Sequence, residues 1–265
     1  MPTVPSSLAA VAPCIDDPSG TALLVDFDGS LALIVDDPAA ARALPAALDG
    51  LTRLVSVLGR VAVVSGRPVE FLHTHVPVDG VTWVGLYGLE RMVDGARVVE
   101  PAAREWIPAV AEAAATLERQ LPDLLVERKG ELAVTVHWRT HSARATEAAA
   151  IVAEVSDALG LDAPLRGRMA MEVRPPVGLD KGTVTSELVQ GMRVGMFAGD
   201  DAGDLPAFDA LRRARDADDL DHAICIGVRS DEGPPGILTA DLVVDGPRGL
   251  AQLFADLATA IESRS

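Results

Sequence analysis

The 265-residue sequence predicts an α/β protein in which a doubly wound core, built on a parallel sheet, is interrupted by an inserted α+β domain. Six short runs are apolar throughout, which is typical of parallel strands covered on both faces. Segment 104–175 differs, because its strand-like runs alternate more between polar and apolar residues. We therefore predict a core formed by 1–103 and 176–265, with the insert at 104–175.

The first half of the core has a β-α-β pattern. Between the first two apolar runs, segment 45–59 places Leu48, Leu51 and Leu54 on one helical face. Proline near its start and glycine at its end suit a helix of this length. The predicted strands in this half are 22–25, 61–64 and 81–84.

The second half continues the alternation of helices and strands, whereas the insert does not. Its more alternating strands and Ala-rich helices predict an antiparallel sheet with helices on one face. In the core, we expect helices at 180–192 and 204–214 and strands at 194–198, 223–228 and 242–244. In the insert, we expect helices at 104–121 and 141–160 and strands at 124–130, 132–140 and 167–175.

Composition excludes several classes of partner. The net charge of −16 argues against nucleic acid and anionic membranes. No apolar run approaches the roughly 18 residues of a membrane span, and the first twenty residues do not resemble a secretory signal. Two cysteines, Cys14 and Cys225, imply neither a disulfide framework nor a metal site. We expect a cytoplasmic protein with a small-molecule substrate and no obligate protein partner.

Polar side chains follow three predicted strands and open one predicted helix. Because the carboxyl ends of parallel strands share one edge of the sheet, these four features should converge in one cleft. They comprise Asp26 and Asp28, then Ser65 and Gly66, then Lys181, and finally Asp200, Asp201 and Asp204. Each feature alone has an ordinary explanation as a turn or a helix cap, so the prediction depends on the whole set.

The chemistry that this set favours is phosphoryl transfer. Residues i and i+2 of a strand face the same way, so Asp26 and Asp28 would crowd two carboxylates unless a cation or proton neutralises them. One aspartate can attack phosphorus while the other moves protons. Mg²⁺ bound by Asp26 and Asp200 would remove the repulsion between carboxylate and phosphate. Ser65 and Lys181 would then hold the remaining phosphate oxygens.

The four features resemble the motifs of the haloacid dehalogenase-like phosphatase superfamily: "DFDGS", "VVSG", Lys181 and "GDDAGD". The resemblance implies a Rossmann-like core with Asp26 as nucleophile and Asp28 as acid and base. It implies Mg²⁺ held by Asp26, the Asp28 main-chain carbonyl and Asp200. Ser65, Gly66 and Lys181 would bind the phosphoryl group. Asp201 and Asp204 would orient either metal-bound water or Lys181.

Further stretches, "GLYGLE", "VERKG", "HWR" and "MEVRPPVGLDKG", resemble trehalose-6-phosphate phosphatases from about residue 20 to 250. This resemblance implies hydrolysis of a phosphorylated disaccharide, trehalose 6-phosphate, and makes the insert a cap over the active site. It also implies that Glu127, Lys129 and Glu172 bind the sugar, with Glu90 nearby.

Ser30 stands where the family usually has threonine, but it keeps the hydroxyl, so we expect little loss. Two other departures leave the sugar open: Tyr87 stands where members often have histidine, and Leu205 where glutamate often follows the last aspartate. The phosphatase could therefore act on another sugar phosphate. A non-catalytic phosphosugar-binding protein would be expected to have lost the core aspartates or Lys181. Without the resemblance, "VERKGE" would be interpreted as a charged edge strand.

Overall fold

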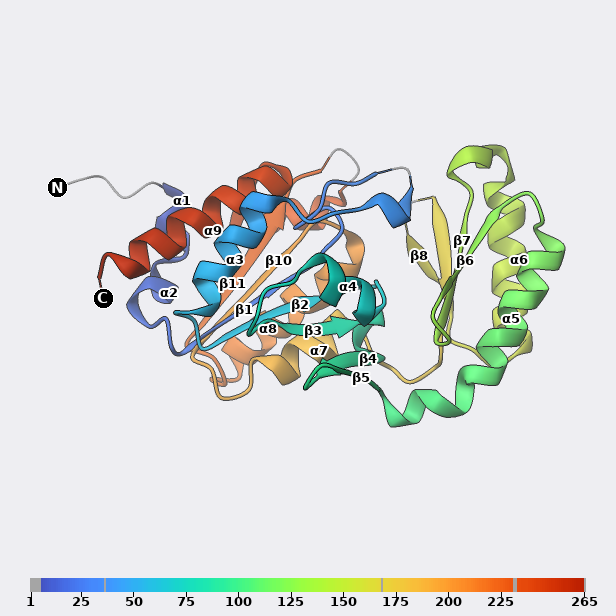
Figure 1. Cartoon of the computed structure of the whole chain (residues 1–265), viewed down its shortest axis with the longest axis horizontal. Helices are drawn as coiled ribbons and strands as arrows, with labels where there is room; N and C mark the ends of the chain where they lie inside the picture. The colour runs from blue at the N-terminus through green and yellow to red at the C-terminus, as the bar shows by residue number, and fades with distance from the viewer. Residues whose placement is uncertain (1–5, 36, 168, 231–232, 265) are drawn as a thin grey trace. The chain divides into compact units, whose positions relative to one another are not determined.

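A computed structural model of the protein describes residues 6–35, 37–167, 169–230 and 233–264. The chain forms two compact units (Figure 1). The core unit comprises Met1–Arg97 and Leu179–Ser265, and the insert unit comprises Val98–Gly178. The predicted insert at 104–175 lies within the insert unit and is slightly shorter than it.

The core unit contains an eight-stranded sheet in the order β12-β11-β10-β1-β2-β3-β4-β5. Strands β12 to β3 run parallel, and β4 is antiparallel to β3. All six predicted core strands are confirmed: β1 (Thr21–Val25), β2 (Arg60–Val64), β3 (Thr82–Gly85), β10 (Val194–Gly199), β11 (His222–Val228) and β12 (Leu242–Val244). The sequence analysis missed the edge strands β4 (Glu90–Val93) and β5 (Ala96–Val99), which an Asp94-Gly95 turn connects.

Both faces of this sheet are covered, which explains why its strands are apolar throughout. In β1, Leu23 and Val25 face one hydrophobic cluster, whereas Ala22 and Leu24 face another. The first cluster involves α1 (Ser6–Ala10), α2 (Ala12–Asp16), α3 (Pro45–Val55), α4 (Val69–His75) and α9 (Gly246–Glu262). The second involves α7 (Lys181–Leu188) and α8 (Leu205–Asp216). The fold is therefore the doubly wound arrangement predicted from the sequence.

The insert unit is an antiparallel sheet in the order β6-β7-β9-β8. Its core consists of inward-facing strand residues packed against two helices, as predicted. These elements are β6 (Leu125–Lys129), β7 (Ala133–His137), β8 (Leu165–Gly167), β9 (Ala170–Val173), α5 (Ile107–Gln120) and α6 (Ala145–Ala158). The segment predicted as a single strand at 167–175 instead contributes to the β8–β9 hairpin. None of the described helices is long and apolar enough to cross a bilayer.

Candidate active site

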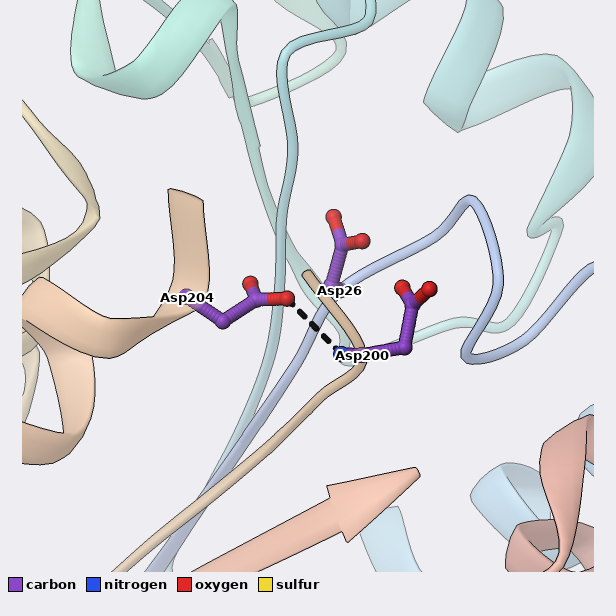
Figure 2. A group of neighbouring side chains, drawn as sticks. All are labelled: Asp26, Asp200 and Asp204. Atoms are coloured by element: carbon purple, nitrogen blue, oxygen red, sulfur yellow. Dashed lines mark hydrogen bonds between the residues drawn. The ribbon is translucent and has the colours of Figure 1, made fainter. Parts of the chain in front are cut away.

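The strand ends of the core sheet converge as the topology requires. Strand β1 lies between β10 and β2, with Val25 paired to Ala198 on one side and Val63 on the other. The Asp26 N–H donates to the Ala198 carbonyl oxygen at 2.9 Å, which extends the pairing one residue beyond β1. Asp26 and Asp200 therefore leave adjacent strands side by side (Figure 2).

Lys181 connects two buried carboxylates at this edge. Its Nζ lies 2.7 Å from Asp26 Oδ1 and 2.6 Å from Asp204 Oδ1. The other oxygen of Asp204, Oδ2, accepts the N–H groups of Asp200 at 2.8 Å and Asp201 at 3.0 Å. Asp204 thus fixes both the ammonium group and the loop after β10. Of the two predicted tasks, orienting Lys181 is the one that this geometry favours for Asp204.

Burial and the neighbouring opposite charges act in opposite directions on the pKa of Asp26 and on that of Lys181. Burial raises the pKa of Asp26 well above its ordinary value, although the Lys181 charge counteracts the effect. Burial would lower the pKa of Lys181, but Asp204 and Asp26 outweigh it and raise that pKa. Lys181 is therefore a fixed cation beside the predicted nucleophile.

The charges of this cluster fit a bound cation. Asp26, Asp200 and Asp204 each offer a carboxylate oxygen, and these atoms lie within 4.8 Å of one another. All three side chains are buried, and when all are ionised their three negative charges exceed the single positive charge of Lys181 by two. Because Asp204 is occupied by Lys181 and two N–H groups, Asp26 and Asp200 are the residues suited to hold a hard divalent ion.

A glycine makes room for this cluster. Gly29 has a φ of 81°, and a Cβ atom there would lie 2.2 Å from Asp200 Oδ2. The turn after Asp26 can approach the Asp200 carboxylate this closely only without a side chain. The glycine of "DFDGS" is thus explained by contact with a residue about 170 positions later in the chain.

The Asp28 carboxylate does not join the acidic cluster, contrary to the expectation that the two aspartates face the same way. The chain leaves the extended conformation after Asp26, since the Leu31 and Ala32 N–H groups both donate to the Phe27 carbonyl. Asp28 instead accepts two hydrogen bonds from Arg67, at Nε and Nη2, both 2.7 Å long. The sequence analysis gave Arg67 no role, although it follows Ser65 by only two residues.

Ser65 lies at the end of β2, as predicted, and is buried. Its N–H donates to the Val84 carbonyl at 3.0 Å, and its Oγ accepts from the Arg67 N–H at 3.3 Å. The side-chain oxygen of buried Ser30, Oγ, has no hydrogen-bond partner among the described residues. Asp201 Oδ1 accepts from the Gly203 N–H at 2.8 Å, so this residue shapes the loop that carries Asp204.

In the insert unit, a row of polar side chains crosses one face of the sheet. Glu127 pairs in register with Thr135, and Thr135 with Glu172, so the three share a face. Lys129 and His137 lie two residues further along β6 and β7. Glu172 Oε2 lies 2.5 Å from Lys129 Nζ and accepts from Thr135 Oγ1 at 3.0 Å. His137 Nε2 lies 2.8 Å from Glu127 Oε2.

Glu90 has a different environment from the other predicted sugar ligands. It is buried in the core unit, where its Oε1 accepts the Val69 N–H at the start of α4. Its Oε2 pairs with Arg97 Nε at 2.5 Å. Both carboxylate oxygens therefore hold core elements together, and contact between Glu90 and a sugar stays a prediction.

Comparisons with known proteins place these two units in a family. A family model described as trehalose-phosphatase matches residues 24–235. The chain belongs to the trehalose-phosphatase family. The chain is 33% identical over 255 residues to the trehalose-phosphate phosphatase of Mycobacterium avium. The aligned region covers 91% of this chain and 63% of that protein. A Mycobacterium tuberculosis relative is also 33% identical, over 89% of this chain and 61% of its own length.

The chain thus spans just under two thirds of the length of these curated relatives. Solved structures show the same fold at lower identity. The Candida albicans trehalose-6-phosphate phosphatase C-terminal domain has a TM-score of 0.78 and 20% identity, with 97% of each chain covered. A trehalose-6-phosphate phosphatase related protein has a TM-score of 0.71 and 22% identity, over 92% of this chain and all of the other.

Proposed function

We propose that this member of the trehalose-phosphatase family hydrolyses trehalose 6-phosphate to trehalose and phosphate through an aspartyl-phosphate intermediate. The observation that carries the proposal is the buried Asp26 beside the Lys181 ammonium, 2.7 Å away, at the strand edge that also holds Ser65 and Asp200. An anionic phosphate can approach a carboxylate only where positive charge balances both groups. The family membership and the relatives' activities support the choice of substrate.

In the proposed reaction, an Asp26 oxygen attacks phosphorus and forms a new P–O bond, while the bond to the sugar oxygen breaks. Lys181, Ser65 and the Gly66 backbone hold the phosphoryl oxygens. Water then attacks phosphorus, which releases phosphate and restores the Asp26 carboxylate. Bound Mg²⁺, held by Asp26, Asp200 and the Asp28 carbonyl, would supply charge neutralisation during both displacements.

Asp28 is the proposed proton donor to the leaving sugar oxygen and the later acceptor from water. Arg67 holds its carboxylate through two hydrogen bonds and donates a third, at 2.8 Å, to the Pro38 carbonyl. This arrangement fixes the direction of the Asp28 side chain. We therefore assign Arg67 as a positioning residue that acts through Asp28.

The polar row of the insert unit is the proposed sugar site. Glu172 Oε1 is buried and, among the described contacts, has no hydrogen-bond partner, while Oε2 is held by Lys129 and Thr135. A sugar hydroxyl could donate to such an oxygen. A site built for these hydrogen bonds discriminates against sugars that leave its polar groups unpaired.

A second candidate function is regulatory binding without turnover. The C-terminal domain of a Candida albicans trehalose synthase regulatory protein shares the fold, with a TM-score of 0.67 at 13% identity. The fold alone therefore does not establish catalysis. The present chain retains Asp26, Asp28, Lys181 and Asp200, and for this reason we favour the enzyme.

The substrate assignment is tested by measuring phosphate release with Mg²⁺ from trehalose 6-phosphate, glucose 6-phosphate and sucrose 6-phosphate. We expect the trehalose ester to have the highest kcat/KM. Asp26→Asn should lower activity by about 10³-fold or more, whereas Asp49→Asn, on the exposed surface of α3, should not. Comparable rates on all three esters would reject trehalose specificity, and activity retained by Asp26→Asn would reject the nucleophile.

The metal assignment has a test that does not need turnover. Mg²⁺ should raise the unfolding temperature of the wild-type protein, because a ligand that binds only the folded state stabilises it. Asp200→Asn should lose this shift, and Asp49→Asn should retain it. An equal Mg²⁺ response in all three proteins would contradict a site at Asp200.

A further inference from the structure

The turn after β3 brings one aromatic side chain to the phosphate end of the core sheet. Leu86 and Tyr87 have φ angles of 47° and 58°, a conformation that costs free energy in residues other than glycine. The Leu86 N–H donates to the Arg67 carbonyl and the Tyr87 N–H to the Ser65 carbonyl, both at 3.0 Å. The turn is therefore hydrogen-bonded to the backbone of Ser65 and Arg67.

The Tyr87 side chain also lies against this backbone. A Cβ atom at Gly66 would be 2.5 Å from the Tyr87 Oη atom and 2.6 Å from its Cζ atom, so the phenol group occupies the space that a side chain would need. On another side, a Cβ atom at Gly203 would be 3.9 Å from Tyr87 Cε1. The ring thus lies against the Ser65–Gly66 segment and faces the loop that carries Asp204.

Tyr87 is near the third phosphate-binding element as well. The next residue, Gly88, packs against α7, the helix that begins at Lys181: a Cβ atom at Gly88 would lie 2.7 Å from Val184 Cγ2. Tyr87 is only partly buried. Its phenol group therefore lies over Gly66, next to Ser65 in the chain, on a turn that also contacts the helix beginning at Lys181, and it is not enclosed in the core.

We propose that Tyr87 is a further phosphate-binding residue, whose phenol hydroxyl donates a hydrogen bond to a phosphoryl oxygen of the substrate. The inference rests on the proposed phosphatase function. Two consecutive residues with positive φ angles suit a functional turn, because strained backbone is concentrated at active and ligand-binding sites.

The first test compares inorganic phosphate binding, in the presence of Mg²⁺, by wild-type protein and Tyr87→Phe. Phenylalanine keeps the ring that fills the space over Gly66 and removes only the hydroxyl. We expect phosphate to bind about 10- to 100-fold more weakly, with an unchanged unfolding temperature. Thr74→Val, which removes an exposed hydroxyl from α4, should bind phosphate normally. Equal affinity in Tyr87→Phe and wild-type protein would show that the ring only fills space and would overturn the proposal.

A second test keeps the wild-type side chain. Tyr87 is the single tyrosine of the sequence, so labelling with 3-fluorotyrosine gives one ¹⁹F resonance. Saturating phosphate with Mg²⁺ should shift this resonance, and an unchanged resonance would overturn the proposal even if Tyr87→Phe does not fold. Both tests use phosphate without a sugar. If trehalose 6-phosphate is not hydrolysed while both effects are observed, the substrate assignment fails and the role of Tyr87 stands.

Discussion

The two lysines of the chain, one in each unit, stand in contrasting environments. Lys181 in the core unit contacts Asp26 and Asp204, and its side chain is 3% exposed. Lys129 in the insert unit contacts the carboxylate of Glu172 and is 12% exposed. Lys181 links its own segment, at the start of α7, to the two segments that carry Asp26 and Asp204. Lys129 links β6 to β9, two strands of one antiparallel sheet that are separated by β7.

This difference separates two ways of building a polar site. In the core, the topology of the parallel sheet brings distant residues to one edge, and the cluster retains excess negative charge that suits a cation. In the insert, strand register aligns complementary side chains on one face, and their charges are largely paired. The first arrangement suits charged chemistry, and the second suits recognition of neutral hydroxyls.

Replacing the core lysine should have the largest effect. Lys181→Met should lower kcat by about 10³-fold, because a fixed charge on the phosphoryl oxygens is lost. It should also lower the free energy of unfolding by about 3–5 kcal/mol without Mg²⁺, since it leaves buried carboxylates without their partner. Denaturant unfolding in a metal chelator measures this change. If Lys129→Met were equally harmful to kcat, the distinction between the two sites would be wrong.

Arg67→Gln should reduce activity by about 10²-fold on a sugar phosphate, because Asp28 loses the groups that aim it at the leaving oxygen. The loss should be less than about tenfold on p-nitrophenyl phosphate, whose leaving group needs no proton. Arg91→Gln is a matched control, since Arg91 also forms a two-bond pair, with Glu187, in the core unit. Equal losses on both substrates would mean that Arg67 only maintains the fold.

Lys129→Met and Glu172→Gln should act on the sugar alone. We expect the KM for trehalose 6-phosphate to rise about tenfold, as for loss of one hydrogen bond to a charged group, with little change on p-nitrophenyl phosphate. Arg128→Gln is the control. Arg128 lies between Glu127 and Lys129 on β6, so it belongs to the opposite face of the sheet, and it pairs with Glu118 of α5. A similar KM increase on the aryl ester would place the defect outside sugar recognition.

The smallest effect is expected at His137, which belongs to the polar row of the insert unit. His137→Asn removes the 2.8 Å contact with Glu127 and should raise the KM for the trehalose ester by roughly two- to fivefold. His141→Asn, on the exposed surface of the same unit, should have no effect. A drop in kcat without a change in KM would argue against a role in positioning Glu127.

The core was more predictable from the sequence than the contacts within it. Each strand end carries its polar residue directly after an apolar run, so Asp26, Ser65 and Asp200 could be assigned to one edge from parallel topology alone. The direction of the Asp28 side chain could not be predicted, because it depends on the residue at which the strand ends and on Arg67, a partner 39 residues away. Helix α9 was missed although Leu250, Leu253 and Leu257 recur at helical spacing.

The account depends most on Asp26 as the residue that accepts the phosphoryl group. The direct measurement is rapid acid quenching during turnover of trehalose 6-phosphate, followed by borohydride reduction, which converts a phosphorylated aspartate to homoserine. Mass spectrometry should find homoserine at position 26 and aspartate at position 28, and no conversion in Asp26→Asn. Conversion at Asp28 or Asp200, or rapid turnover with no conversion at any aspartate, would contradict the proposed mechanism.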